Sequence, residues 1–366
     1  MGLNKLKPAF LFLILALFAL GACNQDAIFH EISEATKPLE ARIKGTPTNM
    51  VVFTRGGRQV LYVASGSSLY AYTGTDWDKD PYKISNPGGI IRSLAATSGY
   101  LYALTYSGLR RISTTGTAWE PIADSSSLEI VCAAGNRVFV GKRVDDQYSI
   151  SYLDEGNFSL HVLQSNTGEL TGVAFNGQDY YLSTKKRIYK VTGTNNTVGF
   201  SVNKEFMGII SLENGTPSAI VAIEREGELY WVNDGGVTSA SKDVGNYASG
   251  ALALWQNSAG TTLLLVGHLA NLSYSSSTSY TYGYKELVLV NGTISGDFKE
   301  PGTNPTSMHT GGNYTSSIGK YPVNHLFQAP AAVDSGRILF ASTGNQGLWS
   351  YRNRSSNGGW QWNAEE

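Results

Sequence analysis

From about residue 46 onward the chain repeats one pattern: an apolar strand, a Gly-rich or polar turn, a second apolar strand, another turn and a third strand. The clearest copies are MVVFTRGGRQVLYVASGSSLYAY, RSLAATSGYLYALTYSGLRRIS and LTGVAFNGQDYYLSTKKRIYKV. Most copies recur every 35–50 residues, a spacing typical of β-propeller blades, and only the last interval is longer, 75 residues from Leu265 to Phe340. One such sheet cannot bury both of its faces, whereas several sheets arranged radially can.

Aligning the copies on their second strand gives seven units. The equivalent residues are Tyr62, Tyr102, Phe139, Tyr181, Tyr230, Leu265 and Phe340. Weaker fourth strands are expected at DPYKIS, AWEPIAD, FSLHVLQ and WQWN. We therefore predict an all-β fold, a seven-bladed β-propeller, over residues 46–366. A β-sandwich or a pair of barrels is the alternative, but neither requires a repeated three-strand pattern.

Closure of the ring has two solutions in the sequence. The segment Trp360-Gln361-Trp362 could supply the outer strand of the seventh blade from the C-terminal end of the chain. A strand from residues 28–45 could pair there instead. The sequence is compatible with both of these closures.

The composition agrees with a turn-rich β protein and excludes one class of function. The chain has 41 Gly and 21 Tyr residues, and only 16% of its residues are charged. Strand-forming residues between many tight turns produce such a composition. The net charge is −1 and no basic run occurs, so the chain lacks the clustered cations with which proteins neutralise nucleic-acid phosphates.

The N-terminus has the pattern of a lipoprotein signal peptide. Lys5 and Lys7 precede the apolar run AFLFLILALFAL, which is too short to span a bilayer comfortably. The run ends in Leu20-Gly21-Ala22-Cys23, which has the form of a bacterial lipobox. We predict a signal peptide over residues 1–22, lipidation of the Cys23 thiol and a tether over residues 23–45. An ordinary signal peptide followed by a chance cysteine is the alternative.

Motifs for catalysis, cofactors or metals are not recognised in the sequence. It has no Gly-x-Ser-x-Gly elbow, phosphate loop or Gly-x-Gly-x-x-Gly. The DWDKD run begins like a calcium loop, but Pro81 occupies the position where such a loop needs glycine. His309 and His325 are expected to be exposed in one polar loop, and Cys132 to be a buried thiol in an apolar strand. We therefore expect no enzyme activity, cofactor or metal.

Two insertions around the sixth blade are the candidate binding elements. The first, NLSYSSSTSYTYGYKE, carries Tyr274, Tyr280, Tyr282 and Tyr284, and the second, over residues 300–325, carries Tyr314. Tyrosine mixed with serine and glycine is typical of antibody-type binding loops. The alternative is that Tyr280, Tyr282 and Tyr284 are alternate residues of a strand, with one face packed on the next blade.

With this lipobox, these degenerate blades and these insertions, the chain resembles spirochaetal surface lipoproteins that act as adhesins for host matrix proteins. The resemblance implies a non-enzymatic protein of the cell envelope, anchored by its lipid in the outer membrane and exposed at the surface. Its ligand would be a protein or a glycan, with host matrix proteins of the fibronectin or laminin class as the expected ligand. A periplasm-facing scaffold in outer-membrane assembly is the alternative, and a propeller glycosidase or lyase is the least favoured one.

Overall fold

The computed structural model describes residues 41–79, 82–193, 196–200, 202–213, 215, 217–245, 247–256, 261–269, 283–298, 318, 321–335, 337–354 and 359–365. These belong to one compact unit, Ala41–Glu366. The predicted signal peptide, Cys23 and most of the predicted tether lie outside the described residues. Among the described residues no helix is long and apolar enough to cross a membrane.

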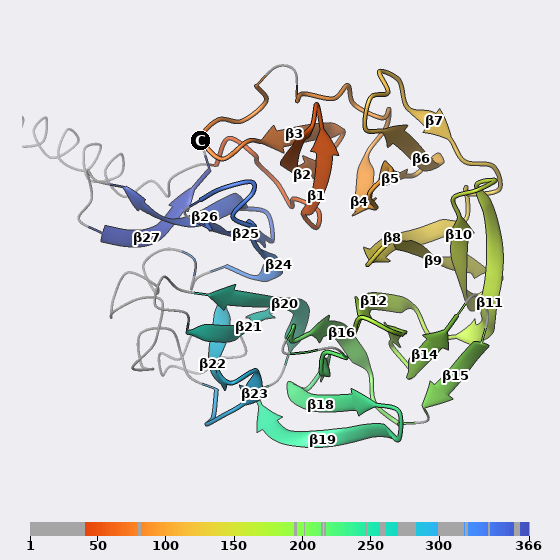
Figure 1. The fold of residues 1–366 in the computed structure, drawn as a ribbon, viewed down its shortest axis with the longest axis vertical. Coiled ribbons are helices and arrows are strands. Elements are labelled where there is room, and N and C mark those ends of the chain that lie inside the picture. Colours follow the sequence, from red (N-terminus) through yellow and green to blue (C-terminus); the bar gives the residue numbers. More distant parts are fainter. Residues whose placement is uncertain are drawn as a thin grey trace, which may run out of the picture. The chain divides into compact units, whose positions relative to one another are not determined.

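The described strands form seven antiparallel sheets around a central axis, which confirms the predicted seven-bladed β-propeller (Figure 1). Blades one to three comprise β1 (Val51–Arg55), β2 (Arg58–Ser65) and β3 (Ser68–Tyr72); β4 (Ile91–Ala96), β5 (Tyr100–Thr105), β6 (Gly108–Ser113) and β7 (Glu120–Pro121); and β8 (Leu128–Ala134), β9 (Arg137–Val144), β10 (Gln147–Asp154) and β11 (Ser159–Thr167).

Blades four and five comprise β12 (Leu170–Phe175), β13 (Tyr180–Thr184), β14 (Ile188–Thr192) and β15 (Asn196–Phe200), followed by β16 (Phe206–Ser211), β17 (Ile220–Glu224), β18 (Glu228–Asn233) and β19 (Gly236–Asp243). Blades six and seven comprise β20 (Ala248–Gln256), β21 (Thr262–His268), β22 (Tyr284–Val290) and β23 (Thr293–Ile294), followed by β24 (Val323–Gln328), β25 (Leu339–Thr343), β26 (Gly347–Arg354) and β27 (Gly359–Ala364).

The first strand of each blade lies nearest the axis, and neighbouring first strands are joined near their starts. Asn49 donates its side-chain amide to the carbonyl of Leu94 at 2.7 Å and accepts the Leu94 backbone N–H at 2.9 Å. The Val131 backbone N–H donates to the Ser93 hydroxyl at 3.1 Å. These bonds join residues at the same level of adjacent strands, so the innermost strands run in parallel around the axis.

The core consists of the boundaries between blades, which are filled mainly by second-strand residues. Six of the seven predicted equivalents lie in second strands and are buried, for example Tyr62 in β2, whose hydroxyl donates to the carbonyl of Tyr82 at 2.8 Å. The prediction for Tyr230 is wrong, because this residue lies in the third strand, β18. The first strand of blade five, β16, is separated from β17 by residues 212–219, and this long connection hid it in the repeat.

The predicted fourth strands are partly confirmed. FSLHVLQ lies in β11 and WQWN in β27, whereas AWEPIAD contributes only β7. The prediction for DPYKIS is wrong for its described residues 82–85, since the described strands of blade one number three. Ile84 of that segment is buried with the residues between blades one and two, and a bridge between Tyr72 and Trp77 takes the place of a fourth strand.

The C-terminal strand supplies the outer strand of blade seven, which is the first of the two options left open by the sequence; residues 28–40 of the second option lie outside the described residues. β27 pairs with β26 as the outermost strand of blade seven. Residues 41–48, which we call the closing segment, run from that blade to blade one. The backbone N–H of Leu348 donates to the carbonyl of Ile43 at 2.9 Å, and that of Thr48 to the carbonyl of Ala64 at 2.8 Å. The compact unit therefore starts at Ala41, ahead of the predicted boundary at residue 46.

Side chains from both ends of the chain reinforce this closure. The indole N–H of Trp77 donates to the Glu365 carboxylate at 2.8 Å, and the Tyr72 hydroxyl donates to Asp334 at 2.7 Å. The ring of Tyr72 also packs edge-on against Phe340, with centroids 5.2 Å apart. Blade one and blade seven are thus joined by backbone, polar and aromatic contacts together.

Candidate functional site

One end of the ring gathers the features that suit recognition, and we call it the entry face. In six blades the end of the second strand pairs with the start of the innermost strand, as Thr105 does with Ile91 and His268 with Ala248. The hairpins that join second and third strands therefore lie beside the starts of the innermost strands. The entry face comprises these starts, the hairpins and the connections that lead into each blade.

Both tyrosine-rich insertions begin and end at the entry face. The first joins the end of β21 to the start of β22, and the second leads from β23 to the start of β24. Their described ends meet, because the Gly283 backbone N–H donates to the Tyr321 carbonyl at 2.9 Å. The candidate binding residues Tyr274, Tyr280, Tyr282 and Tyr314 lie outside the described residues.

Tyr284, the remaining candidate, is a core residue. It has no exposed surface, and its hydroxyl accepts a hydrogen bond from the indole N–H of Trp362 at 3.2 Å. The two rings pack at 5.7 Å between blades six and seven. A side chain without accessible surface cannot meet a ligand from solvent, so Tyr284 follows the packing alternative for the tyrosine row.

Large apolar side chains are exposed at the entry face. Among the described residues, eight large hydrophobic side chains are exposed, and three of these lie on outer parts of the blades: Val162, Val198 and Val290. The other five lie at the entry face: Ile90, Tyr106, Val144, Tyr247 and Leu269. Contiguous exposed apolar patches mark interaction surfaces, whereas single exposed side chains are ordinary; these five residues share one end of the ring.

Arginines accompany the tyrosines at the blade-two and blade-three part of this face. The guanidinium of Arg92 lies over the ring of Tyr106 at 5.2 Å and donates to the carbonyl of Leu128 at 3.0 Å. In the next blade the guanidinium of Arg143 lies over the Tyr148 ring at 5.6 Å. Tyrosine and arginine are the residue types enriched at the centres of protein interfaces.

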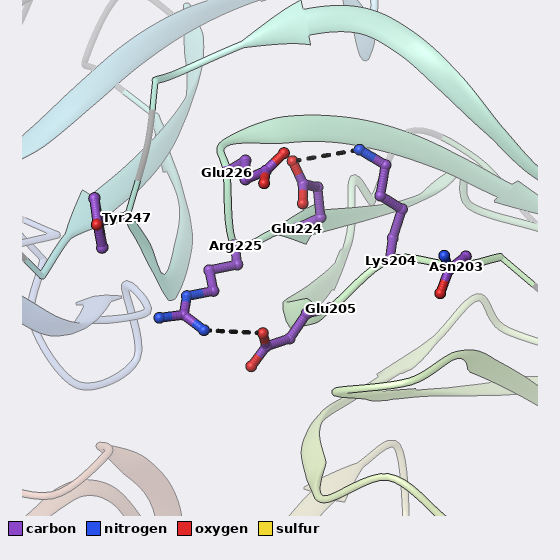
Figure 2. Close-up of a pocket in the computed structure, with 7 residues that line it drawn as sticks. All are labelled: Asn203, Lys204, Glu205, Glu224, Arg225, Glu226 and Tyr247. Atoms are coloured by element: carbon purple, nitrogen blue, oxygen red, sulfur yellow. Dashed lines mark hydrogen bonds and ion pairs between the residues drawn. The ribbon is translucent and has the colours of Figure 1, made fainter.

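A charged pocket of about 530 Å³ opens between the connections into blades five and six (Figure 2). It is lined by Asn203, Lys204, Glu205, Glu224, Arg225, Glu226 and Tyr247. Two ion pairs cross it: Arg225 Nη1 lies 3.1 Å from Glu205 Oε2, and Lys204 Nζ lies 4.0 Å from Glu224 Oε1. The pocket therefore contains its own counter-charges.

The hairpin beside this pocket carries three glutamates, Glu224, Glu226 and Glu228, which differ in exposure. Glu226 is exposed at the turn, but Glu224 is only 3% exposed. Hydrogen bonds from Ser239 and Tyr230 hold the pKa of the Glu228 carboxyl below its usual value, and burial together with the Glu228 carboxylate raises the pKa of Tyr230 to about 12. Two of the three glutamates are thus part of the packed structure.

A cavity of about 950 Å³ lies along the central axis, and all seven innermost strands contribute to its walls. Two titratable side chains, His325 and Cys132, line this cavity. From the sequence, His325 was expected in an exposed loop and Cys132 in an apolar core strand. His325 belongs to β24, not to an exposed loop, and burial lowers its pKa to about 4. Burial raises the pKa of the Cys132 thiol to about 12, so both side chains are uncharged at neutral pH.

The described residues contain no group of three or more His, Cys, Asp and Glu side chains placed to hold a metal ion. The exposed apolar residues of the entry face were not predicted from the sequence. A signal for them exists, because Tyr106 and Val144 stand at hairpin turns, where polar or small residues are usual.

Comparison with known proteins shows the fold. No protein-family model and no curated protein matches the sequence. Virginiamycin B lyase from Staphylococcus aureus superposes with a TM-score of 0.55 over 85% of this chain and 97% of its own, at 9% sequence identity. The extracellular domain of BT4673 from B. thetaiotaomicron gives a TM-score of 0.54 over 87% of this chain and 40% of its own, at 13% identity.

A third similar structure is YCF48 from Cyanidioschyzon merolae, with a TM-score of 0.53 over 88% of this chain and 99% of its own, at 11% identity. The three proteins differ in kind: a lyase, an extracellular domain of a signalling protein and YCF48. At such identities the likeness establishes the β-propeller fold and no function.

Proposed function

We propose that this chain is a lipid-anchored binding protein of the cell envelope that engages a protein partner through the entry face of its propeller. Five exposed apolar side chains on that face carry the proposal, since exposed hydrophobic area of this kind is costly unless a partner covers it. The arginine–tyrosine pairs Arg92–Tyr106 and Arg143–Tyr148 add the residue types that dominate interface energetics.

We include the two insertions in the proposed binding surface. Both are joined to the ring at the entry face, and their sequences combine tyrosine with serine and glycine. Tyrosine offers a large contact area at little conformational cost, while serine and glycine adapt to the partner. A partner of the fibronectin or laminin class, bound without catalysis, is the ligand that we propose.

Attachment to the outer membrane through Cys23, with the propeller exposed at the cell surface, completes the proposal. Two experiments on cells test it. Replacing Cys23 with Ser should abolish incorporation of labelled lipid and release the protein from membranes. Protease added to intact cells should cleave the propeller, whereas a periplasmic scaffold would be protected until the outer membrane is opened.

The ligand is tested with the detergent-solubilised full chain on immobilised fibronectin and laminin. Wild-type protein should bind, and deletion of residues 272–282 should weaken binding at least tenfold. The deletion stops before Tyr284 because that side chain belongs to the core. Absence of wild-type binding to both matrix proteins would contradict this ligand class. Unchanged binding after the deletion would show that the first insertion is not part of the binding surface.

A further inference from the structure

The axial cavity has the size and lining of a small-molecule site. Its volume of about 950 Å³ is in the range of such pockets, about 300–1,000 Å³. Apolar side chains from several blades form much of the wall, among them Val173 of β12, Leu252 of β20 and Phe327 of β24. A wall of this kind favours the apolar part of a ligand.

Several polar side chains in the wall are already engaged in hydrogen bonds within or between blades. The amide of Asn49 bonds the backbone of Leu94, and the hydroxyl of Ser93 accepts the N–H of Val131. The hydroxyl of Thr171 donates to Ser183 at 2.9 Å. These groups have little capacity left for a ligand.

His325 differs from them. Its imidazole lines the cavity and has no hydrogen-bond partner among the described residues. His325 is the residue directly after a shift in the pairing register between β24 and β25. The first strands of four other blades carry a shift at the same place. The four equivalent residues are Ser93, Ile130, Gly172 and Gly208, and three of them are small, so few large side chains compete for the space at this level.

Charge inside the cavity is low. Charged lining residues belong to the starts of strands or to hairpins at the entry face, and two of them are paired: Glu169 with Lys185 at 2.6 Å, and Arg143 with Asp146. The imidazole of His325 and the thiol of Cys132 are neutral at neutral pH because burial disfavours their charged forms. A neutral imidazole nitrogen can accept one hydrogen bond.

We propose that the axial cavity binds an uncharged small molecule with an apolar body and one N–H or O–H group that donates to the imidazole of His325. Arg92, Arg143 and Tyr148 line this cavity and also belong to the entry face, so the site adjoins the protein-binding surface. Its occupant is recognised inside the ring, by the innermost strands, and does not require the insertions.

The test uses N-phenyl-1-naphthylamine, a neutral aromatic probe with a single N–H, in fluorescence titrations of the full chain. Val173→Trp fills the cavity, and Val162→Trp makes the same change on the exposed outer strand β11 as the matched control. Ala96→Phe is a second cavity-filling variant from another blade, and circular dichroism and thermal unfolding establish that each variant is folded.

We expect both cavity-filling variants to weaken probe binding at least tenfold and Val162→Trp to change it less than twofold. His325→Phe should weaken binding about five- to tenfold, the effect of one lost hydrogen bond. Equal binding by wild type and the folded cavity-filling variants, or no wild-type binding, would overturn the site. Unchanged binding by His325→Phe would overturn the recognition by the imidazole.

The same variants separate this inference from the proposed protein binding. Val173→Trp and His325→Phe leave the entry face unaltered, so capture by immobilised fibronectin or laminin should be as in wild type. A chain that binds the probe but neither matrix protein would support the axial site and contradict the proposed partner.

Discussion

Tyrosine serves two regions of this propeller in opposite ways. At the blade boundaries Tyr62 and Tyr102 are completely buried, and their hydroxyls donate to the Tyr82 carbonyl and to Glu155, the latter at 2.5 Å. At the entry face Tyr106 is 70% exposed and Tyr247 38% exposed. Only three residues separate Tyr102 in the core from Tyr106 at the hairpin that follows the same strand.

Buried and exposed tyrosines therefore have different roles in this chain. Burying a tyrosine ring at a boundary removes apolar area from water, and the bonded hydroxyl avoids the cost of an unsatisfied polar group. In the isolated molecule an exposed tyrosine removes little apolar area from water, and its hydroxyl can bond to solvent without help from the protein. Its value arises only when a partner covers it, so we expect boundary tyrosines to control stability and entry-face tyrosines to control binding.

Truncation of the two kinds of tyrosine should give the largest contrast. Tyr102→Ala removes a fully buried ring between blades two and three, and we expect a loss of about 3–5 kcal/mol in the free energy of unfolding. Tyr106→Ala should change it by less than about 0.5 kcal/mol. Urea unfolding followed by circular dichroism measures both, and similar losses would refute the distinction.

The buried imidazole of His325 should give the next largest effect, seen as pH dependence. Burial lowers its pKa from 6.5 to about 4, so between these values the unfolded chain binds a proton that the folded chain does not. Stability is therefore lost as the pH falls from about 6.5 to 4, by up to about 3 kcal/mol. The stability of wild type relative to that of His325→Phe should therefore fall over that window; a constant difference would contradict the shift.

Removal of single hydroxyl groups extends the comparison to smaller effects. Tyr102→Phe deletes the hydrogen bond to Glu155, which keeps a second donor in the Thr97 hydroxyl at 2.7 Å. We expect a loss of about 1–2 kcal/mol in the free energy of unfolding. Tyr106→Phe, the matched change at the entry face, should have no measurable effect on stability, and thermal unfolding of the pair checks this.

The smallest effect is expected in the charged pocket. Glu205→Gln removes the ion pair with Arg225. The side chain of Glu205 is 35% exposed and that of Arg225 is 56% exposed. Because water and salt screen such a pair, we expect less than about 1 kcal/mol, declining further in 1 M salt. A loss above 2 kcal/mol in urea unfolding would mean that the pocket is a structural element and not an open surface.

The propeller was predictable because its pattern is local. Each blade repeats strands and tight turns within about 40 residues, and the alternation around Tyr62, Tyr102 and Phe139 shows which strand is second. The pattern failed at Tyr230, where residues 212–219 separate β16 from β17, and at DPYKIS, where Ile84 packs between blades without forming a strand.

The site was harder to predict because exposure depends on neighbours distant in the sequence. His325 stands in PVNHLFQ next to a long polar insertion, and only its pairing with Ser342 places it in a strand that lines the axis. Tyr106 and Val144 stand next to hairpin turns, which the sequence shows, but the exposure of their side chains depends on the neighbouring blades. For Tyr284 the row of alternate tyrosines suited a loop and a strand equally, and the contact with Trp362 decided the matter.

The most direct test compares two sets of three exposed apolar residues in one binding measurement on immobilised fibronectin and laminin. The entry-face set carries Ile90→Asp, Tyr106→Asp and Val144→Asp, and the matched outer-strand set carries Val162→Asp, Val198→Asp and Val290→Asp. We predict that the entry-face set loses at least tenfold in affinity while the outer-strand set stays within twofold of wild type. Equal losses in both sets, or a loss confined to the outer-strand set, would contradict the entry face as the binding surface.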